Sequence, residues 1–513
     1  MESHRILDMI SSPADLKLLT NEELSILASE IREQIITTTS KTGGHVAPSL
    51  GVVELILACH SVLDCPHDKL LFDVGHQSYA HKLVTGRLGE FDTLRQFGGM
   101  SGFPKASESE YDVHPSGHAS DSVSVALGLA MARDLNGGDE KIVTIIGDAS
   151  LSGGMAFEAL NQLGQLQTPM VIILNDNEMS ISRNVGALAR YLGEKRASRE
   201  YTRTRDSVQS VLEASGPLGR GLVDLGRNAK DSFKQMVIPG EMLFEKLGIT
   251  CTAPIPGHDI AALKRALRVC LKADGPTLLH VVTKKGKGYE PAEENPSKFH
   301  GIGPYDIATG EVKKGSSSAP KYTSVFSKAI VAEAERDHDI VAITAAMKDG
   351  TGLAAFSEKF PKRFIDTGIA EEHAVALASG LALGGKKPVV CIYSTFMQRA
   401  FDQLVINNAL ANTNVVFCLD RAGLVGDDGP THHGVFDIVY GRMVPGVRMM
   451  APSDEAELVH MLHTALALEG PVILRWPRGE ARGVELPAVP QVLEEGKSRT
   501  TREGSDVAIL AFG

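Results

Sequence analysis

The stretch "KIVTIIGDASLSGG", residues 141–154, is an apolar, largely β-branched run that ends at Gly147 and Asp148 and then turns polar and glycine-rich. A second apolar run, "PMVIILNDNEMS" at residues 169–180, also ends in polar side chains, among them Asn177. Continuous runs of this kind are typical of strands that are covered on both faces, and the segment between them suits a helix. The stretch therefore predicts a β–α–β unit with two parallel strands.

The polar residues at the two strand ends are candidates for a metal site. The carboxyl ends of parallel strands open at the same edge of a sheet, where α/β proteins bind ligands, so Asp148 and Asn177 are expected to meet there. One carboxylate and one amide oxygen suit Mg²⁺, which takes its remaining ligands from phosphates and water. The alternative is that Asp148 caps the next helix and Asn177 forms a turn. The spacing alone leaves both interpretations open.

The same alternation of helical and strand patterns continues along most of the 513 residues. "NEELSILASEIREQIITTTS", residues 21–40, has the periodicity of an amphipathic helix. Together these patterns predict an α/β protein with mainly parallel sheets. The apolar runs that predict buried strands lie at residues 142–146, 170–174, 278–282, 340–343, 388–392 and 415–419.

Two breaks in the pattern predict the domain organisation. "GEVKKGSSSAPKYTS", residues 310–324, has the composition of a linker, so residues 1–309 form one α/β domain and residues 325–484 a second. Within the first domain, residues 183–240 are rich in Arg, Gly and Ser and are interpreted as a helical or mobile excursion. Residues 485–513 are expected to be a linker and the first strand, in "DVAILAFG", of a third domain that is truncated.

Composition excludes several classes of function. The hydrophobic fraction of 43% and charged fraction of 22% are those of a globular protein, and a net charge of −11 disfavours binding to nucleic acid or to an anionic membrane. No stretch approaches the roughly 18 apolar residues of a membrane span. The N-terminal residues lack the pattern expected of a secretory signal, and six scattered cysteines without a CxxC pair predict free thiols in the cytoplasm. The chain also lacks the G-x-G-x-x-G and Walker motifs.

A set of motifs in one order identifies a family. The set comprises "TGGHVAPSLGVVEL", "DVGHQSYAHK", "SGHASDSVSVALGLA", "ILNDNEMSIS", "KKGKGYEPAE", "FHGIGPYD", "DTGIAEEHAVALASGLA", "YSTFMQRAFDQ", "DRAGLVGDDGPTHHGVFD" and "LRWPRG". Over about residues 5–490 the chain resembles the 1-deoxy-D-xylulose-5-phosphate synthases, which are transketolase-like thiamine diphosphate enzymes.

The resemblance implies a fold and a reaction. The fold is two thiamine-diphosphate-binding α/β domains, of which one holds the diphosphate with Mg²⁺ and the other holds the pyrimidine. The reaction is the decarboxylating condensation of pyruvate with D-glyceraldehyde 3-phosphate, catalysed by a homodimer. It begins the methylerythritol phosphate route to isoprenoids (terpenoids) and supplies thiamine and pyridoxal phosphate synthesis.

The family's metal and cofactor residues can be carried onto this chain. "SGHASDS", residues 116–122, is expected to open a helix whose N–H groups favour a phosphate. Glu371, the first of two acids in "AEEH", would hydrogen-bond the aminopyrimidine from an apolar pocket; the alternative for Glu371 or Glu372 is a first-turn acid stabilised by the helix dipole. The implied magnesium ligands are Asp148, Asn177 and the main-chain carbonyl of Met179, and the implied cofactor contacts are His76, Gly117, His118, Ala119, Asp148, Ala149, Ser150, Asn177, Tyr289 and Glu371.

Histidines and arginines are the candidates for substrate binding. Histidines recur in glycine-bearing turns, where imidazoles can relay protons; by resemblance His45 and His300 line the donor side of the cofactor and His432 the acceptor side. Guanidinium groups suit the phosphate of the acceptor, and Arg475 competes with Arg478 for that role. The implied substrate residues are Tyr393, Arg399, Arg421, Asp428 and Arg478.

Two departures from the family pattern bear on cofactor affinity. Ala149 stands where the family usually has Gly, which is compatible with a negative φ. Asp121 stands where the family usually has a neutral hydroxyl residue, and its carboxylate would repel a diphosphate unless it turns away to cap its helix. The alternatives to the synthase are a transketolase or 2-oxo acid dehydrogenase subunit, and a non-catalytic paralogue with a binding role.

Overall fold

The computed structural model describes residues 5–177, 179, 184–197, 243–313, 319–500 and 502–513. The chain divides into unit 1, Met1–Lys314, and unit 2, Gly315–Gly513. The helical or mobile excursion expected at residues 183–240 lies outside the described residues except for 184–197, which include the helix α8 (Ala187–Ala197). The domain boundaries expected from the sequence stay predictions.

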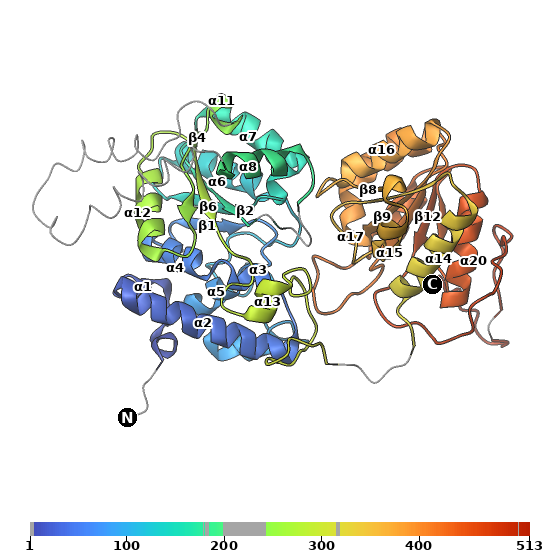
Figure 1. Cartoon of the computed structure of the whole chain (residues 1–513), viewed down its shortest axis with the longest axis horizontal. Helices are drawn as coiled ribbons and strands as arrows, with labels where there is room; N and C mark the ends of the chain where they lie inside the picture. Colours follow the sequence, from blue (N-terminus) through green and yellow to red (C-terminus); the bar gives the residue numbers. More distant parts are fainter. Residues whose placement is uncertain (1–4, 178, 180–183, 198–242, 314–318, 501) are drawn as a thin grey trace, which may run out of the picture. The chain divides into compact units, whose positions relative to one another are not determined.

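Unit 1 is built on a parallel sheet. Its strand order is β1-β2-β3-β6-β4, with β5 paired to β6, and every pairing is parallel (Figure 1). The strands are β1 (Lys69–Phe72), β2 (Ile142–Gly147), β3 (Val171–Asp176), β4 (Thr250–Cys251), β5 (Ile255–Pro256) and β6 (Thr277–Val282).

The helix α2 of unit 1 begins and ends where the sequence supplies caps. α2 (Asn21–Thr42) begins at Thr20, whose hydroxyl accepts the Glu23 N–H while the Glu23 carboxylate accepts the Thr20 N–H, and ends at Gly43. The other described helices of unit 1 are η1 (Ile6–Met9), α1 (Pro13–Leu16), α3 (Val46–Leu50), α4 (Val53–Val62), α5 (Tyr79–Lys82), η2 (Leu83–Arg87), η3 (Leu88–Thr93), α6 (Ser122–Asn136), η4 (Ser150–Ser152), α7 (Gly154–Leu166), α11 (Leu243–Lys246), α12 (Ile260–Cys270) and α13 (Glu290–Glu294).

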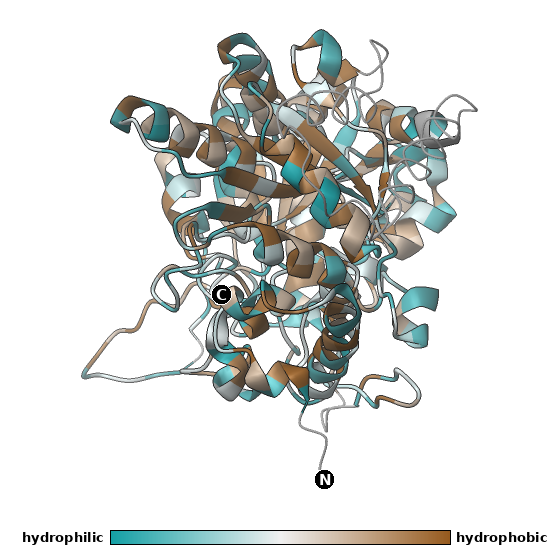
Figure 2. Cartoon of the chain, turned by 90° about the vertical axis from the view of Figure 1, so that its left-hand side faces the viewer, coloured by the Kyte–Doolittle hydropathy of each residue, from teal (hydrophilic) through white to brown (hydrophobic). Residues whose placement is uncertain are grey.

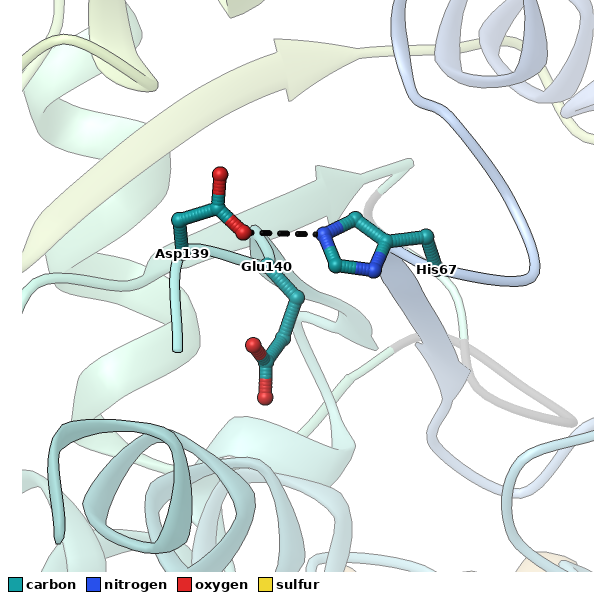
Figure 3. Close-up of side chains that lie close together, drawn as sticks. All are labelled: His67, Asp139 and Glu140. Carbon is teal, nitrogen blue, oxygen red and sulfur yellow. Dashed lines mark hydrogen bonds and ion pairs between the residues drawn. The ribbon is translucent and has the colours of Figure 1, made fainter. Parts of the chain in front are cut away.

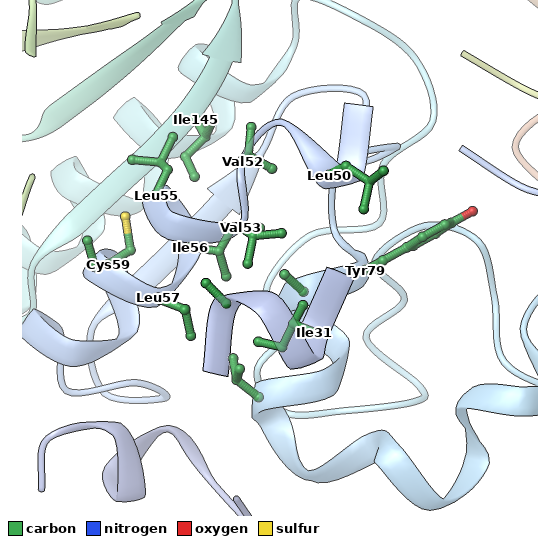
Figure 4. Close-up of a cluster of buried hydrophobic side chains, with 14 of the residues drawn as sticks. Ile31, Leu50, Val52, Val53, Leu55, Ile56, Leu57, Cys59, Tyr79 and Ile145 are labelled. Carbon is green, nitrogen blue, oxygen red and sulfur yellow. The ribbon is translucent and has the colours of Figure 1, made fainter. Parts of the chain in front are cut away.

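Both faces of this sheet are buried, which explains the continuous apolar runs. Because successive side chains of a strand point to opposite faces, Ile145 of β2 joins a core with α2, α4 and α12, whereas Ile146 joins a core with α6 and α7. Figure 4 shows part of the first of these cores, to which Ile31 of α2, Ile56 of α4 and Ile145 of β2 all belong. In Figure 2 the strands are mainly hydrophobic, while the helices carry both hydrophobic and hydrophilic residues.

Unit 2 repeats the same architecture. Its sheet has the order β11-β12-β10-β9-β7-β8, again with parallel pairings only. The strands are β7 (Ile340–Thr344), β8 (Phe364–Asp366), β9 (Lys387–Tyr393), β10 (Val416–Asp420), β11 (Arg448–Met450) and β12 (Val472–Arg475).

The helices of unit 2 cover the two faces of this sheet. One core holds Val389 and Val416 with residues of α14 and α20, and the other holds Val390 and Phe417 with residues of α16. The helices are α14 (Tyr322–Arg336), α15 (Ala354–Lys359), η5 (Pro361–Arg363), α16 (Glu371–Leu383), α17 (Ser394–Met397), η6 (Gln398–Ala400), α18 (Phe401–Gln403), η7 (Leu404–Ala409), α19 (Asp437–Met443) and α20 (Glu455–Ala467).

The predicted α/β class is confirmed, and the six apolar runs correspond to β2, β3, β6, β7, β9 and β10. The sequence interpretation missed the short strands β1, β4, β5, β8, β11 and β12. The strand expected in residues 506–513 is not formed: Ile509 and Leu510 are 85% and 97% exposed, because no strand within the described part of the chain supplies them with backbone partners. The third domain stays a prediction.

Candidate functional site

The ends of β2 and β3 lie side by side, as the sequence predicts. Gly147 is in register with Asn175, and the Asp148 N–H donates to the Asn175 carbonyl at 3.3 Å. Asp148 is buried, with 6% of its surface exposed. Parallel pairing therefore brings the acid that follows β2 to the polar segment that ends β3.

A second buried acid, Asp176, lies next to the Asp148 carboxyl. Burial, together with the neighbouring Asp176 carboxyl, raises the pKa of Asp148. Asp176 Oδ2 lies 2.9 Å from His280 Nε2, and both side chains are 1% exposed. Two buried acids side by side form a donor set that a hard divalent cation would neutralise, so these residues fit Mg²⁺.

The two interpretations of Asp148 and Asn177 are not exclusive. Asp148 Oδ1 accepts the Ala149 N–H at 3.0 Å, and Asn177 Oδ1 accepts the Met179 N–H at 3.1 Å, as in a turn. A carboxylate and an amide oxygen each keep acceptor capacity after one hydrogen bond. The turn at Asn177 is therefore present, and the ligand roles of Asn177 and of the Met179 carbonyl stay predictions.

The start of α6 differs from the expectation. The sequence predicts that the N–H groups at the start of this helix bind a phosphate. In the structure the two carboxylate oxygens of Asp73, which follows β1, accept the Ser120 N–H at 2.9 and 3.0 Å, and one of them accepts the Ser122 N–H at 3.3 Å. Asp121 does not cap the helix with its side chain; its Oδ2 lies 3.3 Å from His114 Nε2. Ala149 has a φ of −68°, so the alanine is unstrained, as expected.

Three of the predicted histidines gather in unit 1. The ring centroids of His45, His76 and His300 lie 5.0 to 6.0 Å from one another. They come from a loop before α3, the turn after β1 and the segment after α13, so only the fold brings them together. The grouping is compatible with their predicted places beside the cofactor.

Lys285 is a member of this cluster that sequence reasoning missed. Its Nζ lies 3.0 Å from His300 Nδ1, and the side chain is buried. Burial lowers the pKa of the Lys285 ammonium to about 7, against the opposing effect of Asp148. The motif "KKGKGYEPAE" gave a predicted role to Tyr289 and none to Lys285; the apolar strand β6 shortly before it was the available signal that this lysine is buried.

Tyr289 lies at the start of α13 in an aromatic group. Its hydroxyl donates to the Ile307 carbonyl at 2.8 Å, and its ring contacts those of Phe299 and Tyr305. Its predicted cofactor contact stays a prediction, as do those of His118, Gly117 and Ser150.

In unit 2, Glu371 occupies the first turn of α16. It is 3% exposed, and among the described residues its Oε2 has no hydrogen-bond partner. Burial raises the pKa of Glu371 to about 7, although Arg399, whose Nη1 lies 3.5 Å away, opposes the effect. The side chain of Glu372 is 36% exposed. The structure therefore buries the acid that the resemblance selects and leaves its neighbour near water.

The burial of Glu371 makes the stability of the cofactor-free protein depend on pH. An acid whose pKa rises from 4.5 to about 7 on folding destabilises the fold increasingly as pH rises through that window. The difference corresponds to about 3 kcal/mol above pH 7. We expect Glu371→Gln to raise the free energy of unfolding by up to that amount at pH 8 and by little at pH 4, measured by urea denaturation. An equal gain at both pH values would contradict the burial of an ionisable acid.

The predicted acceptor residues meet at the ends of β9 and β10. The Arg421 guanidinium lies over the Tyr393 ring at 4.0 Å, and Arg478 Nη1 lies 3.3 Å from Asp428 Oδ2. Burial raises the pKa of the Tyr393 hydroxyl; the charge of Asp428 adds to this effect and that of Arg478 opposes it. The structure thus groups Tyr393, Arg421 and Asp428 with one partly exposed arginine, Arg478.

Two other arginines are placed elsewhere. Arg475 Nε is 2.8 Å from Oδ2 of Asp437, a fully buried acid, which favours Arg478 over Arg475 as the residue available to a ligand. Arg399, to which the resemblance gives a substrate role, lies 3.5 Å from Glu371 and 3.9 Å from Glu372, and its substrate role stays a prediction. Neither position followed from local sequence, because each partner is distant in the chain.

His432 is linked to Tyr393 through the ring of Phe396. Its ring lies 5.5 Å from that of Phe396, which stacks at 5.7 Å on Tyr393. Its Nδ1 is 3.0 Å from the Thr431 hydroxyl. His433 is used differently, since its Nδ1 accepts the Val425 N–H at 3.0 Å.

A second group with metal-ligand side chains, His67, Asp139 and Glu140, lies on the surface of unit 1 (Figure 3). His67 Nε2 and Asp139 Oδ1 are 3.1 Å apart, with side chains 57% and 90% exposed. This is an ordinary surface ion pair. Within the part of the chain that the structure describes, no helix has the length and apolar character needed to cross a membrane.

Comparison with known proteins gives matches over both units. Residues 7–283 match the family model for 1-deoxy-D-xylulose-5-phosphate synthase, and residues 318–484 match that for the transketolase pyrimidine binding domain. The 1-deoxy-D-xylulose-5-phosphate synthase of Syntrophomonas wolfei is 52% identical over 99% of this chain and 79% of its own length, and that of Desulforudis audaxviator is 53% identical over 99% and 80%. A transketolase structure from Campylobacter jejuni is 18% identical, covers 90% of this chain and 80% of its own, and has a TM-score of 0.39.

Proposed function

This chain belongs to the 1-deoxy-D-xylulose-5-phosphate synthase family, and we propose on that basis which of its residues carry the reaction. The enzyme is a transferase that condenses pyruvate with D-glyceraldehyde 3-phosphate, releasing CO₂ and forming 1-deoxy-D-xylulose 5-phosphate, the first step of the methylerythritol phosphate route. The observation that carries this function is identity of 52% to a named synthase over 99% of the chain.

The function is tested by supplying the purified protein with thiamine diphosphate, Mg²⁺, pyruvate and D-glyceraldehyde 3-phosphate. We expect CO₂ release and a ketose product of mass equal to 1-deoxy-D-xylulose 5-phosphate. A parallel reaction with a ketose phosphate donor in place of pyruvate distinguishes a transketolase. Product from the ketose donor, with none from pyruvate, would overturn the assignment.

The family uses thiamine diphosphate with a divalent metal, and the residues at the ends of β2 and β3 fit that group. We assign Mg²⁺ to Asp148, Asn177 and the Met179 carbonyl, and the diphosphate to the Gly117–Ala119 turn, the Ala149 and Ser150 backbone, and His76. When bound, the cofactor supplies a nucleophilic thiazolium carbon, which is the difficult chemistry of the reaction.

The proposed task of Glu371 is to hold and move a proton at the aminopyrimidine ring. Its burial raises the pKa of the carboxyl to about 7, so near pH 7 a large fraction of it is protonated and able to donate a hydrogen bond. Arg399 lies close enough to limit that effect without forming a hydrogen bond of normal length to Oε2. The pair therefore places the titration of Glu371 in the range where the enzyme works.

On the donor side we propose that His45 and His300 bind and orient pyruvate. Lys285 Nζ and His300 Nδ1 share one hydrogen bond, so the lysine engages the Nδ1 side of the ring and the substrate would meet its Nε2 side. Phe103, whose ring lies 5.2 Å from that of His45, covers this group and helps to exclude water.

On the acceptor side we propose that Arg421 and Arg478 bind the phosphate, that Tyr393 supports Arg421, and that Asp428 and His432 contact the hydroxyl and aldehyde. Two guanidinium groups match the charge and geometry of a phosphate. The stacking of Arg421 on Tyr393 orients its guanidinium before the substrate arrives.

Removal of the Arg478 guanidinium should act on one substrate only. We expect Arg478→Ala to raise KM for D-glyceraldehyde 3-phosphate about 10- to 100-fold, the loss of a charge-assisted hydrogen bond, while KM for pyruvate changes little. Steady-state kinetics with each substrate varied in turn measures both values. The control is Arg482→Ala, which removes an exposed arginine from the same segment; an equal rise for Arg482→Ala would contradict a specific phosphate contact.

The remaining expectations concern assembly and location. We propose a homodimer in the cytoplasm without a nucleic-acid or membrane partner, on the basis of the resemblance and of the charge and cysteine pattern. Light scattering on the purified protein measures the first of these.

A further inference from the structure

Asp73 is a buried acid next to the proposed cofactor site and is not one of the proposed metal, cofactor or substrate ligands. It follows β1 directly and is 1% exposed. Its two oxygens accept the Ser120 N–H at 2.9 and 3.0 Å and the Ser122 N–H at 3.3 Å. These bonds join the turn after β1, which carries His76, to the segment that carries Gly117–Ala119.

Ser120 extends the connection to a third loop. Its hydroxyl donates to the Ser150 carbonyl at 2.7 Å, in the loop that follows β2 and carries Asp148. Ser120 has a φ of 77°, a left-handed conformation that is rare for serine. A Cβ at Gly153 would collide with the Ser120 hydroxyl, so this close approach requires glycine there.

The three loops that Asp73 and Ser120 connect are those proposed to surround the diphosphate. A strained backbone persists only where surrounding contacts over-determine it, and here those contacts are the bonds to Asp73 and Ser150. A carboxylate suits this position because it presents acceptors only, whereas an asparagine would turn an NH₂ group toward backbone N–H donors.

We propose that Asp73, acting through Ser120, is a positioning residue that holds the three diphosphate-binding loops in their cofactor-competent arrangement. It touches neither substrate nor cofactor; it lowers the cost of ordering the backbone groups that do. The inference rests on the proposed cofactor site, and a purely structural role for Asp73 would instead affect stability alone.

The test compares Asp73→Asn with Asp68→Asn. Asp68 lies immediately before β1 and Asp73 immediately after it. Asp68 is also buried and also accepts two backbone N–H groups, from Asp64 and Lys141, each at 2.7 Å. It is therefore a matched control at the opposite end of the same strand. Thermal unfolding of the cofactor-free proteins and calorimetric titration with thiamine diphosphate and Mg²⁺ are the two readouts.

Both variants are expected to lower the Tm of the cofactor-free protein by similar amounts. Only Asp73→Asn should weaken cofactor binding, by about 10- to 100-fold, which is the range for removing groups that orient ligand-binding residues. Its kcat should recover at saturating cofactor. Equal affinity in Asp73→Asn and wild type, or equal losses in both variants, would overturn the inference. If wild type itself binds no cofactor, the proposed site fails instead.

Ser120→Ala keeps the test informative if Asp73→Asn does not fold. It keeps a side chain with a Cβ at this left-handed backbone position and removes only the hydrogen bond from the Ser120 hydroxyl to the Ser150 carbonyl. We expect a several-fold loss of cofactor affinity with little change in Tm. Unchanged affinity in this variant would remove the proposed link to the loop after β2.

Discussion

Glu371→Gln should lower kcat about a thousandfold while cofactor binding stays within a few-fold of wild type. Glutamine keeps the size of the side chain and can still donate a hydrogen bond, but it cannot accept or release the proton that the aminopyrimidine ring exchanges. General acid–base groups contribute about 10²- to 10⁴-fold to rate, and Glu371 is the buried acid of its pair.

Steady-state rates of CO₂ release measure this effect, and calorimetry measures cofactor binding. Glu372→Gln is the matched control, because it alters the adjacent, partly exposed acid on the same helix turn. A loss of similar size in both variants, or a Glu371→Gln enzyme with wild-type kcat, would remove Glu371 from the proposed role.

Asp148→Asn should abolish magnesium-dependent binding of thiamine diphosphate. The amide keeps an oxygen but lacks the negative charge that draws a hard cation out of its water shell. We therefore expect the cofactor dissociation constant to rise by more than about 100-fold. This exceeds the loss typical when a residue that only supports a metal ligand is removed. The cofactor-free protein should not lose stability, because the substitution removes one of two adjacent buried acids.

Titration of thiamine diphosphate with and without Mg²⁺ checks this prediction. Asp139→Asn is the control, since Asp139 belongs to the exposed His67 ion pair and has no proposed role in the site. Magnesium-dependent binding by Asp148→Asn that matches wild type would contradict the proposed metal site. Loss of binding in Asp139→Asn would show that the surface group of Figure 3 matters after all.

The position of Asp121 bears on cofactor affinity. The sequence suggested that its carboxylate either repels the diphosphate or caps α6, and the structure shows a third arrangement in which it pairs with His114. An imidazole partner offsets negative charge beside the start of α6 to the extent that it is protonated. The cap position that the sequence offered to Asp121 is filled by Asp73, which the sequence interpretation did not consider.

The sequence by itself determined the α/β class, the six principal strands and the meeting of Asp148 with the end of β3. These follow from local rules: continuous apolar runs are strands buried on both faces, and a right-handed crossover makes consecutive strands parallel, so their carboxyl ends coincide. The choice of Glu371 as the buried acid rested on the family resemblance and on the apolar composition of its helix.

The tertiary structure alone decided which side chains share a site. Arg475 and Arg478 are indistinguishable in "LRWPRG", and only Asp437, 38 residues away, holds the first of them. Lys285 joins His300, and Asp73 caps a helix 49 residues later, for the same reason. A charged side chain is placed by the partner that offsets its desolvation, and that partner is brought near by packing rather than by sequence spacing.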